Sequence, residues 1–198
     1  FLPRTVEYIE KKIDVIEPGS NRVRLEDGTV LDYHVLVIAT GSKIFPDEIE
    51  GLAEDGWGRN IFDFYTMEGA TALREALKGF RGGRLLVHLS EMPIKCPVAP
   101  LEFTFLMDWF LHKQGIRDET ELVYATPLSE AFTKHNCSVV LNYLLEKKQI
   151  HLQTEFNVER VDGAKNRIHG YGDRSIDYDL MVTIPTNMGD PVIERSGL

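Results

Sequence analysis

The sequence predicts an α/β fold in which a small antiparallel β-meander precedes a parallel sheet. Up to Leu31, short runs of alternating apolar residues are separated by two turn signals, Pro18 to Asn21 and Asp27-Gly28. From Met67 onward, apolar runs of strand length alternate with stretches of helical periodicity. This alternation is typical of strand–helix–strand units, which build parallel sheets.

The N-terminal part is expected to be mostly antiparallel β-structure. Apolar residues alternate between Arg4 and Ile16, again between Arg22 and Leu25, and from Thr29 to Leu31. The next run, Tyr33 to Gly41, has a continuous apolar centre, which is typical of a strand buried on both faces of a parallel sheet. Residues 44–60 are rich in glycine, proline and acidic side chains, and we interpret them as a connector.

Residues 61–185 are expected to form a doubly wound α/β domain with a β-hairpin. Helical spacing of apolar residues predicts a helix from Met67 to Phe80, with Thr66 as its N-cap. The other predicted elements are strands at 84–89, 121–125, 150–152 and 178–184, helices at 101–113 and 138–148, and a hairpin of 156–161 with 166–169. We interpret residues 186–198 as a return towards the first domain.

The composition narrows the classes of partner. The formal net charge of −9 provides no basic surface for nucleic acid, and no apolar run reaches the roughly 20 residues of a membrane helix. The two cysteines, Cys96 and Cys137, do not make a disulfide framework, and we expect a reducing, cytoplasmic location, although a bond between them stays open. No group of residues has metal-ligand spacing, so we assign no metal.

Both ends of the chain suggest a segment of a longer protein. The sequence begins at Phe1 without a methionine and ends at Leu198, directly after Ser196-Gly197. We therefore expect neighbouring segments on both sides.

Cys96 is the most informative candidate for chemistry. It lies between Met92 and Pro100, just after the apolar run Leu85 to Leu89. A nucleotide-binding fold would have a glycine-rich phosphate loop at this strand end, so a cysteine between prolines favours thiol chemistry over nucleotide binding. Lys95 and the helix that follows would favour the thiolate, which is the reactive form. The alternative is a structural cysteine that behaves as a small apolar residue.

Ala39-Thr40-Gly41 ends the buried run and is a second candidate site. Small residues there let the backbone approach a ligand closely at the carboxyl end of a parallel sheet. With the preceding meander, this turn resembles the end of the first flavin-domain segment in flavoproteins with two dinucleotide-binding domains, which include the pyridine nucleotide-disulfide oxidoreductases. The resemblance implies FAD contacts from Ala39, Thr40 and Gly41, and an adenine contact from the backbone near Ile13.

The same resemblance implies a Rossmann-like FAD/NAD(P)-binding fold. Residues 1–43 would be the meander and last strand of the FAD domain, and residues 61–185 a second, NAD-binding-like domain. The second half is similar to the sulfide:quinone oxidoreductase and flavocytochrome c sulfide dehydrogenase branch of that family. This similarity rests on Phe64 to Thr66, Gly69-Ala70, Arg81 to Gly83, Lys95 to Pro100, Tyr178 to Pro185 and Ser196 to Leu198.

That branch implies an FAD-dependent oxidoreductase that oxidises sulfide or a related sulfur substrate at Cys96. Electrons would pass through the flavin to quinone or another acceptor. The chain lacks the family's N-terminal glycine motif, its C-terminal Gly-Asp motif and its membrane-reaching C-terminal helices. We therefore expect the isolated segment to be inactive, to bind FAD weakly or not at all, and to be peripheral to the membrane only through segments outside it.

Family members use further cysteines, and here the upstream position offers only Phe62, Phe64 and Tyr65. One thiol supports a sulfur-reactive site but not a multi-cysteine polysulfide mechanism. Homo-oligomerisation stays open. So do two other functions, an NAD(P)H-using relative such as a type II NADH dehydrogenase and a non-catalytic Rossmann-like interaction domain. The first of these would carry a glycine motif after Arg84 to Leu89, which this sequence lacks.

Overall fold

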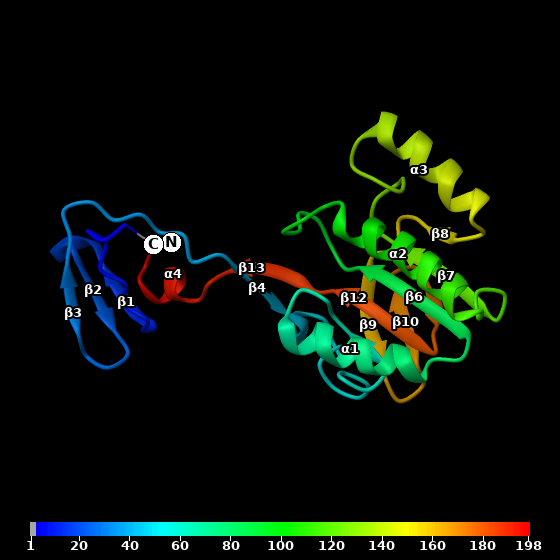
Figure 1. The fold of residues 1–198 in the computed structure, drawn as a ribbon, viewed down its shortest axis with the longest axis horizontal. Coiled ribbons are helices and arrows are strands. Elements are labelled where there is room, and N and C mark those ends of the chain that lie inside the picture. Colours follow the sequence, from blue (N-terminus) through cyan, green and yellow to red (C-terminus); the bar gives the residue numbers. More distant parts are fainter. Residues whose placement is uncertain (1–2) are drawn as a thin grey trace. The chain divides into compact units, whose positions relative to one another are not determined.

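The computed structural model describes residues 3–198 and divides into two compact units. The smaller unit contains the residues up to Lys43 and residues 188–198, and the larger unit contains residues 44–187. Strands β4 (Ser42–Phe45) and β13 (Thr186–Gly189) pair with each other where the chain leaves the smaller unit and returns to it (Figure 1).

The smaller unit is built on a three-stranded antiparallel meander, as predicted. Its strands β1 (Ile13–Glu17), β2 (Arg22–Leu25) and β3 (Val30–Asp32) pair in sequence order. A short 3₁₀ helix, η1 (Pro18–Ser20), makes the first turn, and the short helix α4 (Val192–Arg195) contacts β1. The small core consists mainly of Ile16, Val23 and Leu25.

Two N-terminal strand predictions are wrong. Residues 3–12 form no strand, and β1 begins only at Ile13. The run from Tyr33 to Gly41 forms no strand, and Val35 and Val37 are each 83% exposed. A buried parallel strand needs hydrogen-bonded neighbours on both sides. Within the described smaller unit the meander strands pair only with one another, so this run has no neighbour.

The larger unit is centred on a five-stranded parallel sheet of order β5-β12-β6-β7-β8. Its strands and the helices between them are β5 (Ile61–Phe62), α1 (Met67–Gly79), β6 (Gly83–Leu89), α2 (Ala99–Gln114), β7 (Thr120–Ala125), α3 (His135–Lys147), β8 (His151–Gln153) and β12 (Leu180–Ile184). All of them lie within a few residues of the predicted elements except β5, which was not predicted. Two residues are too few to show a period in the sequence.

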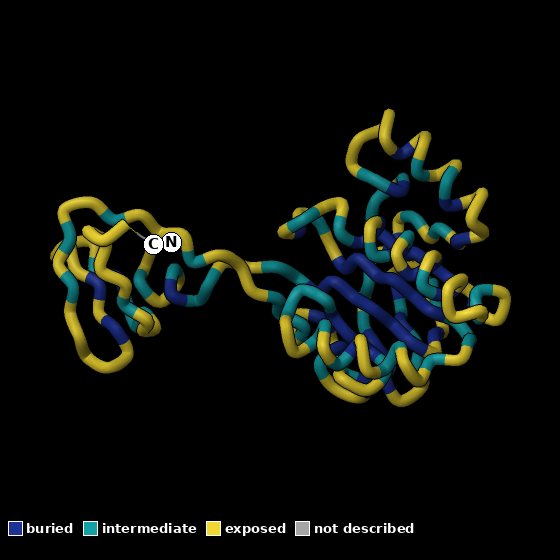
Figure 2. Tube along the Cα trace, viewed as in Figure 1, coloured by how far each residue is buried: buried dark blue, intermediate teal, exposed yellow. Residues whose placement is uncertain are grey.

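The two faces of this sheet have different coverings. Leu85 and Val87 of β6 pack with apolar residues of α1, α2 and α3, whereas Leu86 packs on the opposite side against an antiparallel sheet. That sheet consists of β9 (Val158–Asp162), β10 (Arg167–Gly170) and β11 (Arg174–Asp177). Buried residues therefore gather in the parallel strands between the two layers (Figure 2).

The α/β class is thus confirmed, but the expected doubly wound arrangement, which has helices on both faces of the sheet, is wrong. The connections β5–α1–β6–α2–β7–α3–β8 all advance in one direction across the sheet. Right-handed crossovers that advance in one direction place every helix on the same face. The other face is left to the antiparallel sheet, of which the sequence predicted the first two strands.

A second 3₁₀ helix, η2 (Pro46–Glu48), precedes β5. In residues 3–198 no helix has the length and apolar character needed to cross a bilayer.

Candidate functional site

The loop that carries Cys96 lies at the carboxyl end of β6, in the middle of the parallel sheet. Residues 90–98 connect β6 to α2. The buried side chain of Ile94 anchors this loop in a small apolar cluster with Leu89 and Ile184, the last residues of β6 and β12. Tyr65, from the connection between β5 and α1, packs against the same cluster. The loop therefore crosses the edge of the sheet where adjacent parallel strands end, which is where α/β folds bind ligands.

Cys96 itself begins a tight turn into α2. Its carbonyl oxygen accepts a hydrogen bond from the Ala99 amide at 3.1 Å, and Pro97 occupies the second position of this turn, which suits its fixed φ. Helix α2 begins at Ala99, with Pro100 in its first turn. The thiol is half-buried and free, and it lies three residues before the positive end of a helix dipole.

A tyrosine from another element reaches the same turn. The Tyr65 hydroxyl donates a hydrogen bond to the Cys96 carbonyl oxygen at 3.3 Å. Burial raises the pKa of Tyr65, and the nearby charge of a Cys96 thiolate raises it further. The phenol is therefore a neutral donor under ordinary conditions.

Asp63 fixes the backbone on which Tyr65 stands. Asp63 is only 2% exposed, and one of its carboxylate oxygens accepts from the amides of Tyr65 and Thr66, both at 2.7 Å. The other oxygen accepts from the Thr66 hydroxyl at 3.0 Å, and Thr66 in turn accepts from the Gly69 amide at 2.9 Å. Thr66 is thus the N-cap of α1, as predicted. Asp63 was not singled out from the sequence, although an Asp three residues before a threonine cap is a signal that could have found it.

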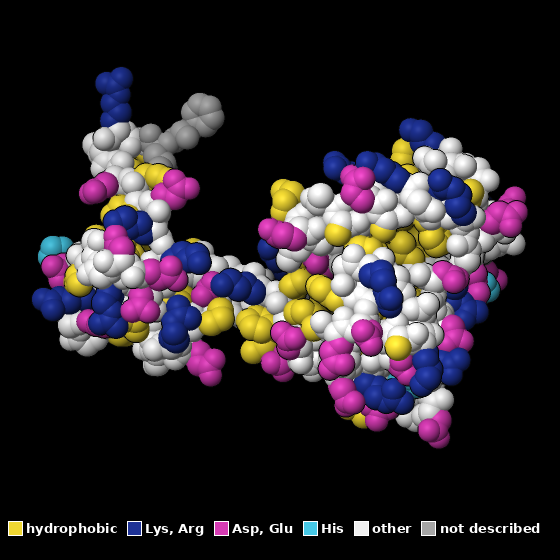
Figure 3. All heavy atoms as spheres, turned by 90° about the horizontal axis from the view of Figure 1, so that it is seen from below, with side chains coloured by type: hydrophobic (Ala, Val, Ile, Leu, Met, Phe, Trp, Pro, Cys, Tyr) yellow, Lys and Arg dark blue, Asp and Glu magenta, His cyan; other side chains and the backbone are white. Residues whose placement is uncertain are grey.

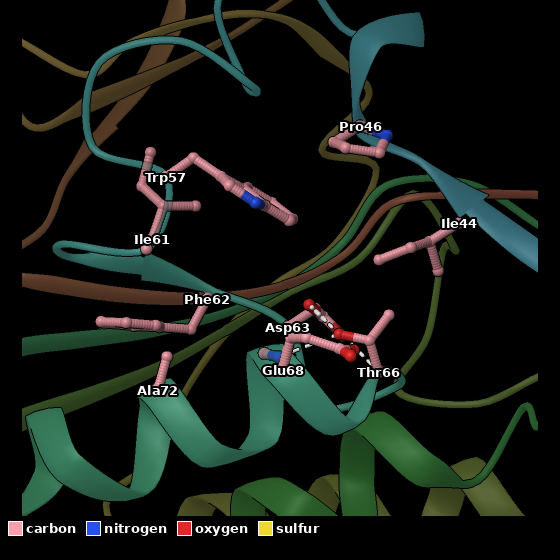
Figure 4. A pocket seen from close by; sticks show the side chains of 11 residues that line it. Ile44, Pro46, Trp57, Ile61, Phe62, Asp63, Thr66, Glu68 and Ala72 are labelled. Atoms are coloured by element: carbon pink, nitrogen blue, oxygen red, sulfur yellow. Dashed lines mark hydrogen bonds between the residues drawn. The ribbon is translucent and has the colours of Figure 1, made fainter.

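A pocket of about 340 Å³ lies on the other side of this capped segment. Its walls are mostly apolar and come from β5, the first turns of α1 and the segment before β5 (Figure 4). They include Ile44, Pro46, Trp57, Ile61, Phe62 and Ala72, while Asp63, Thr66 and Glu68 supply its polar edge. Asp63 and Thr66 therefore face this pocket, while Tyr65 reaches the Cys96 loop, and Cys96 does not line the pocket.

The residues predicted to contact FAD lie in the smaller unit. Gly41 has a left-handed φ of +72°, but a Cβ atom placed on it would meet no atom within 4 Å. Ala39 is exposed and Thr40 half-buried in the unpaired run. Ile13 is the first residue of β1, and its carbonyl oxygen accepts from Arg195 at 3.4 Å. Gly41 therefore has open space beside it, and a dinucleotide would need walls on several sides, so the contacts of Ala39, Thr40, Gly41 and Ile13 with FAD stay a prediction.

The remaining cysteine and the surface add little chemistry. Cys137 is exposed in the first turn of α3 and, like Cys96, is a free thiol. In the described part of the chain, His, Cys, Asp and Glu side chains form no group of three or more that could hold a metal ion. Acidic and basic side chains are mixed over the visible face of both units (Figure 3).

Known proteins resemble the chain over its whole length. No protein-family model matches it. It is 25% identical to a mitochondrial sulfide:quinone oxidoreductase of Dictyostelium discoideum over 100% of this chain, and 23% identical to that of Mus musculus over 98%. It covers 45% of each relative, so it spans about half of their length.

A solved structure gives the same result for the fold. The sulfide:quinone oxidoreductase of Aquifex aeolicus superposes with a TM-score of 0.82 at 19% identity, over 96% of this chain and 45% of the other. The central parallel sheet with its helical and antiparallel layers is thus the fold of an FAD/NAD(P)-binding oxidoreductase. Sequence and fold agree over almost every residue: the chain is similar to the sulfide:quinone oxidoreductase branch of the FAD-dependent oxidoreductases and spans about half the length of such a protein.

Proposed function

We propose that the protein containing this chain oxidises sulfide, or a related small sulfur compound, at Cys96 and passes the electrons to quinone. The observation that carries this proposal is the position of Cys96. The thiol lies in a turn at the carboxyl end of the central strand, braced by Pro97 and followed at once by α2. The curated relatives are named for sulfide as donor and quinone as acceptor, which supports the same chemistry.

The proposed reaction uses the thiolate of Cys96 as the group that holds sulfur. Sulfide and the thiolate form a new S–S bond and give a persulfide. Forming this bond is a two-electron oxidation, so protons and two electrons must leave the two sulfur atoms. A flavin bound by the full-length protein would accept these two electrons and pass them to quinone. The role of this chain is to keep the thiol half-buried in one orientation, so that it points toward a bound sulfur substrate and not freely into solvent.

FAD binding in the parent protein is part of the proposal. Ala39, Thr40 and Gly41 would contribute a backbone edge, and Ile13 a contact from β1, with further walls from the remaining half of the protein. We also propose that any membrane association is peripheral and uses segments outside this chain.

Replacing Cys96 tests the proposal. In the full-length protein, reduction of the flavin by sulfide is followed as the decrease in flavin absorbance. Cys96→Ser should slow this reduction by at least about 100-fold, because a hydroxyl cannot form a persulfide. Cys137→Ser is the matched control and should keep the wild-type rate. If Cys96→Ser reduces the flavin at the wild-type rate, Cys96 is only structural.

A further inference from the structure

We propose that Tyr65 is a positioning residue that holds Cys96 in one half-buried orientation through the hydrogen bond of its phenol to the Cys96 backbone. The importance of this role rests on the proposed function of Cys96. The bond itself concerns the turn and can be tested without sulfide or flavin.

The first part of the evidence is the rigidity of the segment that carries Tyr65. The buried Asp63 carboxylate accepts from the Tyr65 amide, the Thr66 amide and the Thr66 hydroxyl, at 2.7, 2.7 and 3.0 Å. Because a buried carboxylate with several donors is costly to disturb, the Tyr65 backbone is fixed relative to α1. The ring is then held by Phe64, which meets it edge-on at 5.2 Å between ring centres.

The second part is the target of the hydroxyl. The Cys96 carbonyl oxygen accepts two hydrogen bonds, one from Ala99 inside the turn and one from Tyr65 outside it. Within residues 3–198, the Tyr65 phenol is the side-chain group that donates a hydrogen bond to the backbone of Cys96. Tyr65 therefore ties the reactive turn to the neighbouring crossover of the sheet, whereas the Ala99 bond ties the turn only to itself.

The third part is that the phenol stays a donor while the thiol ionises. Burial raises the pKa of Tyr65 above its usual value near 10, and an ordinary thiol ionises near pH 8.5. A neutral hydroxyl therefore faces the Cys96 turn in both protonation states of an ordinary thiol. If it is removed, the ring packing stays but the outer restraint on the turn is lost.

The test measures the reactivity of Cys96 in a chain that carries Cys137→Ser, so that Cys96 is the single thiol. The rate of alkylation by iodoacetamide is measured from about pH 6 to about pH 10. The plateau at high pH gives the limiting rate, which is the rate of the fully ionised thiol. Tyr65→Phe should raise this limiting rate by about two- to tenfold, because the half-buried thiol becomes more accessible to this small probe when the turn opens, and losing one such hydrogen bond shifts an opening equilibrium by that factor. Tyr143→Phe, on a side chain that is 60% exposed on α3, is the matched control and should leave the rate unchanged.

Two further measurements separate positioning from general stability. The Tm should stay close to that of the parent, and hydrogen exchange of the Ala99 amide, which shares the Cys96 carbonyl, should speed up while the amides of β6 keep their protection. A limiting rate that is unchanged or lower would overturn the proposal, and so would faster exchange in β6 to the same degree as at Ala99. If Cys96→Ser leaves sulfide oxidation intact, the proposed function fails, but the alkylation result still decides whether Tyr65 holds the turn.

Discussion

His88 lies in the centre of the larger unit, one residue before the end of β6, and is completely enclosed. Its Nδ1 atom lies 3.0 Å from the Thr183 hydroxyl, and its ring meets Phe156 edge-on. Burial lowers the pKa of His88 to about 3, because the positively charged ring has no water around it. The ring is therefore neutral at physiological pH, and the fold depends on its staying so.

The low pKa of His88 predicts a loss of stability in acid. In the unfolded chain a histidine takes up a proton near pH 6.5, whereas the folded chain resists protonation until about pH 3. The unfolded state thus binds more protons between these values, and the free energy of unfolding falls as the pH drops through this window. At pH 4.5 the loss from this residue should be about 2–3 kcal/mol relative to pH 7.

Urea unfolding at several pH values checks this expectation. His88→Gln should flatten the dependence of the unfolding free energy on pH between about 6.5 and 4.5, whatever its effect at neutral pH. The exposed His34→Gln is the control and should keep the parental slope. An equally steep slope in His88→Gln would show that other groups cause the acid sensitivity.

Helix α1 shows how one residue type has opposite effects at two positions. A Cβ atom on Gly69 would lie 1.9 Å from the Asp63 carboxylate and 2.9 Å from the Asp63 carbonyl oxygen. On Gly79, the last residue of the same helix, it would meet nothing within 4 Å. Gly69 is therefore required for the close approach of α1 to its capping carboxylate, whereas Gly79 is not.

Two alanine substitutions in α1 test this reading. Gly69→Ala should destabilise the larger unit by about 1–3 kcal/mol, because the added methyl group displaces the buried Asp63 carboxylate. Helix propensity alone predicts a gain of up to about 1 kcal/mol. Gly79→Ala should be neutral or slightly stabilising. Thermal melts followed by circular dichroism would decide, and a stabilised Gly69→Ala protein would contradict the expected clash.

The elements differ in how far the sequence could predict them. Helix α1 and strands β6, β7 and β12 have apolar patterns that coincide with burial, whereas Val139, Val140 and Tyr143 of α3 are exposed although the pattern still located that helix. The run from Tyr33 to Gly41 has the same apolar character, yet it is unpaired and its valines are exposed. The apolar pattern indicates the environment in which a segment is stable. It does not show whether neighbouring strands are present to provide that environment.

The candidate site was predicted in the same partial way. Cys96 could be singled out because a cysteine between prolines is unusual after a buried strand. The contact of Tyr65 with the Cys96 turn could not be predicted, and neither could the role of Asp63 beside it. Tyr65 follows β5 and Cys96 follows β6, and the two residues meet because β5, β12 and β6 end at the same edge of the sheet. Long-range contacts of this kind follow from strand order, and the sequence predicted alternation but not the position of β12 between β5 and β6.

The whole chain should bind FAD weakly or not at all when it is produced alone. Gly41, one of the predicted FAD contacts, has open space beside it, and the chain spans only about half the length of its relatives. Purification in the presence of FAD, followed by gel filtration and absorbance, would measure the bound flavin. The full-length protein is the control and should retain it. A yellow chromophore in a one-to-one ratio with the 198-residue chain would contradict the prediction.

The pairing of β4 with β13 gives residues 44–187 the topology of an insertion. These residues leave the smaller unit and return to it through two strands that lie side by side, so the first and last residues of the insert are neighbours. An insert with adjacent ends can be excised, replaced or given new termini without cutting through its own sheet. The same arrangement lets a gene gain or lose such a module in a single event, because the host unit needs only a short turn to close the gap.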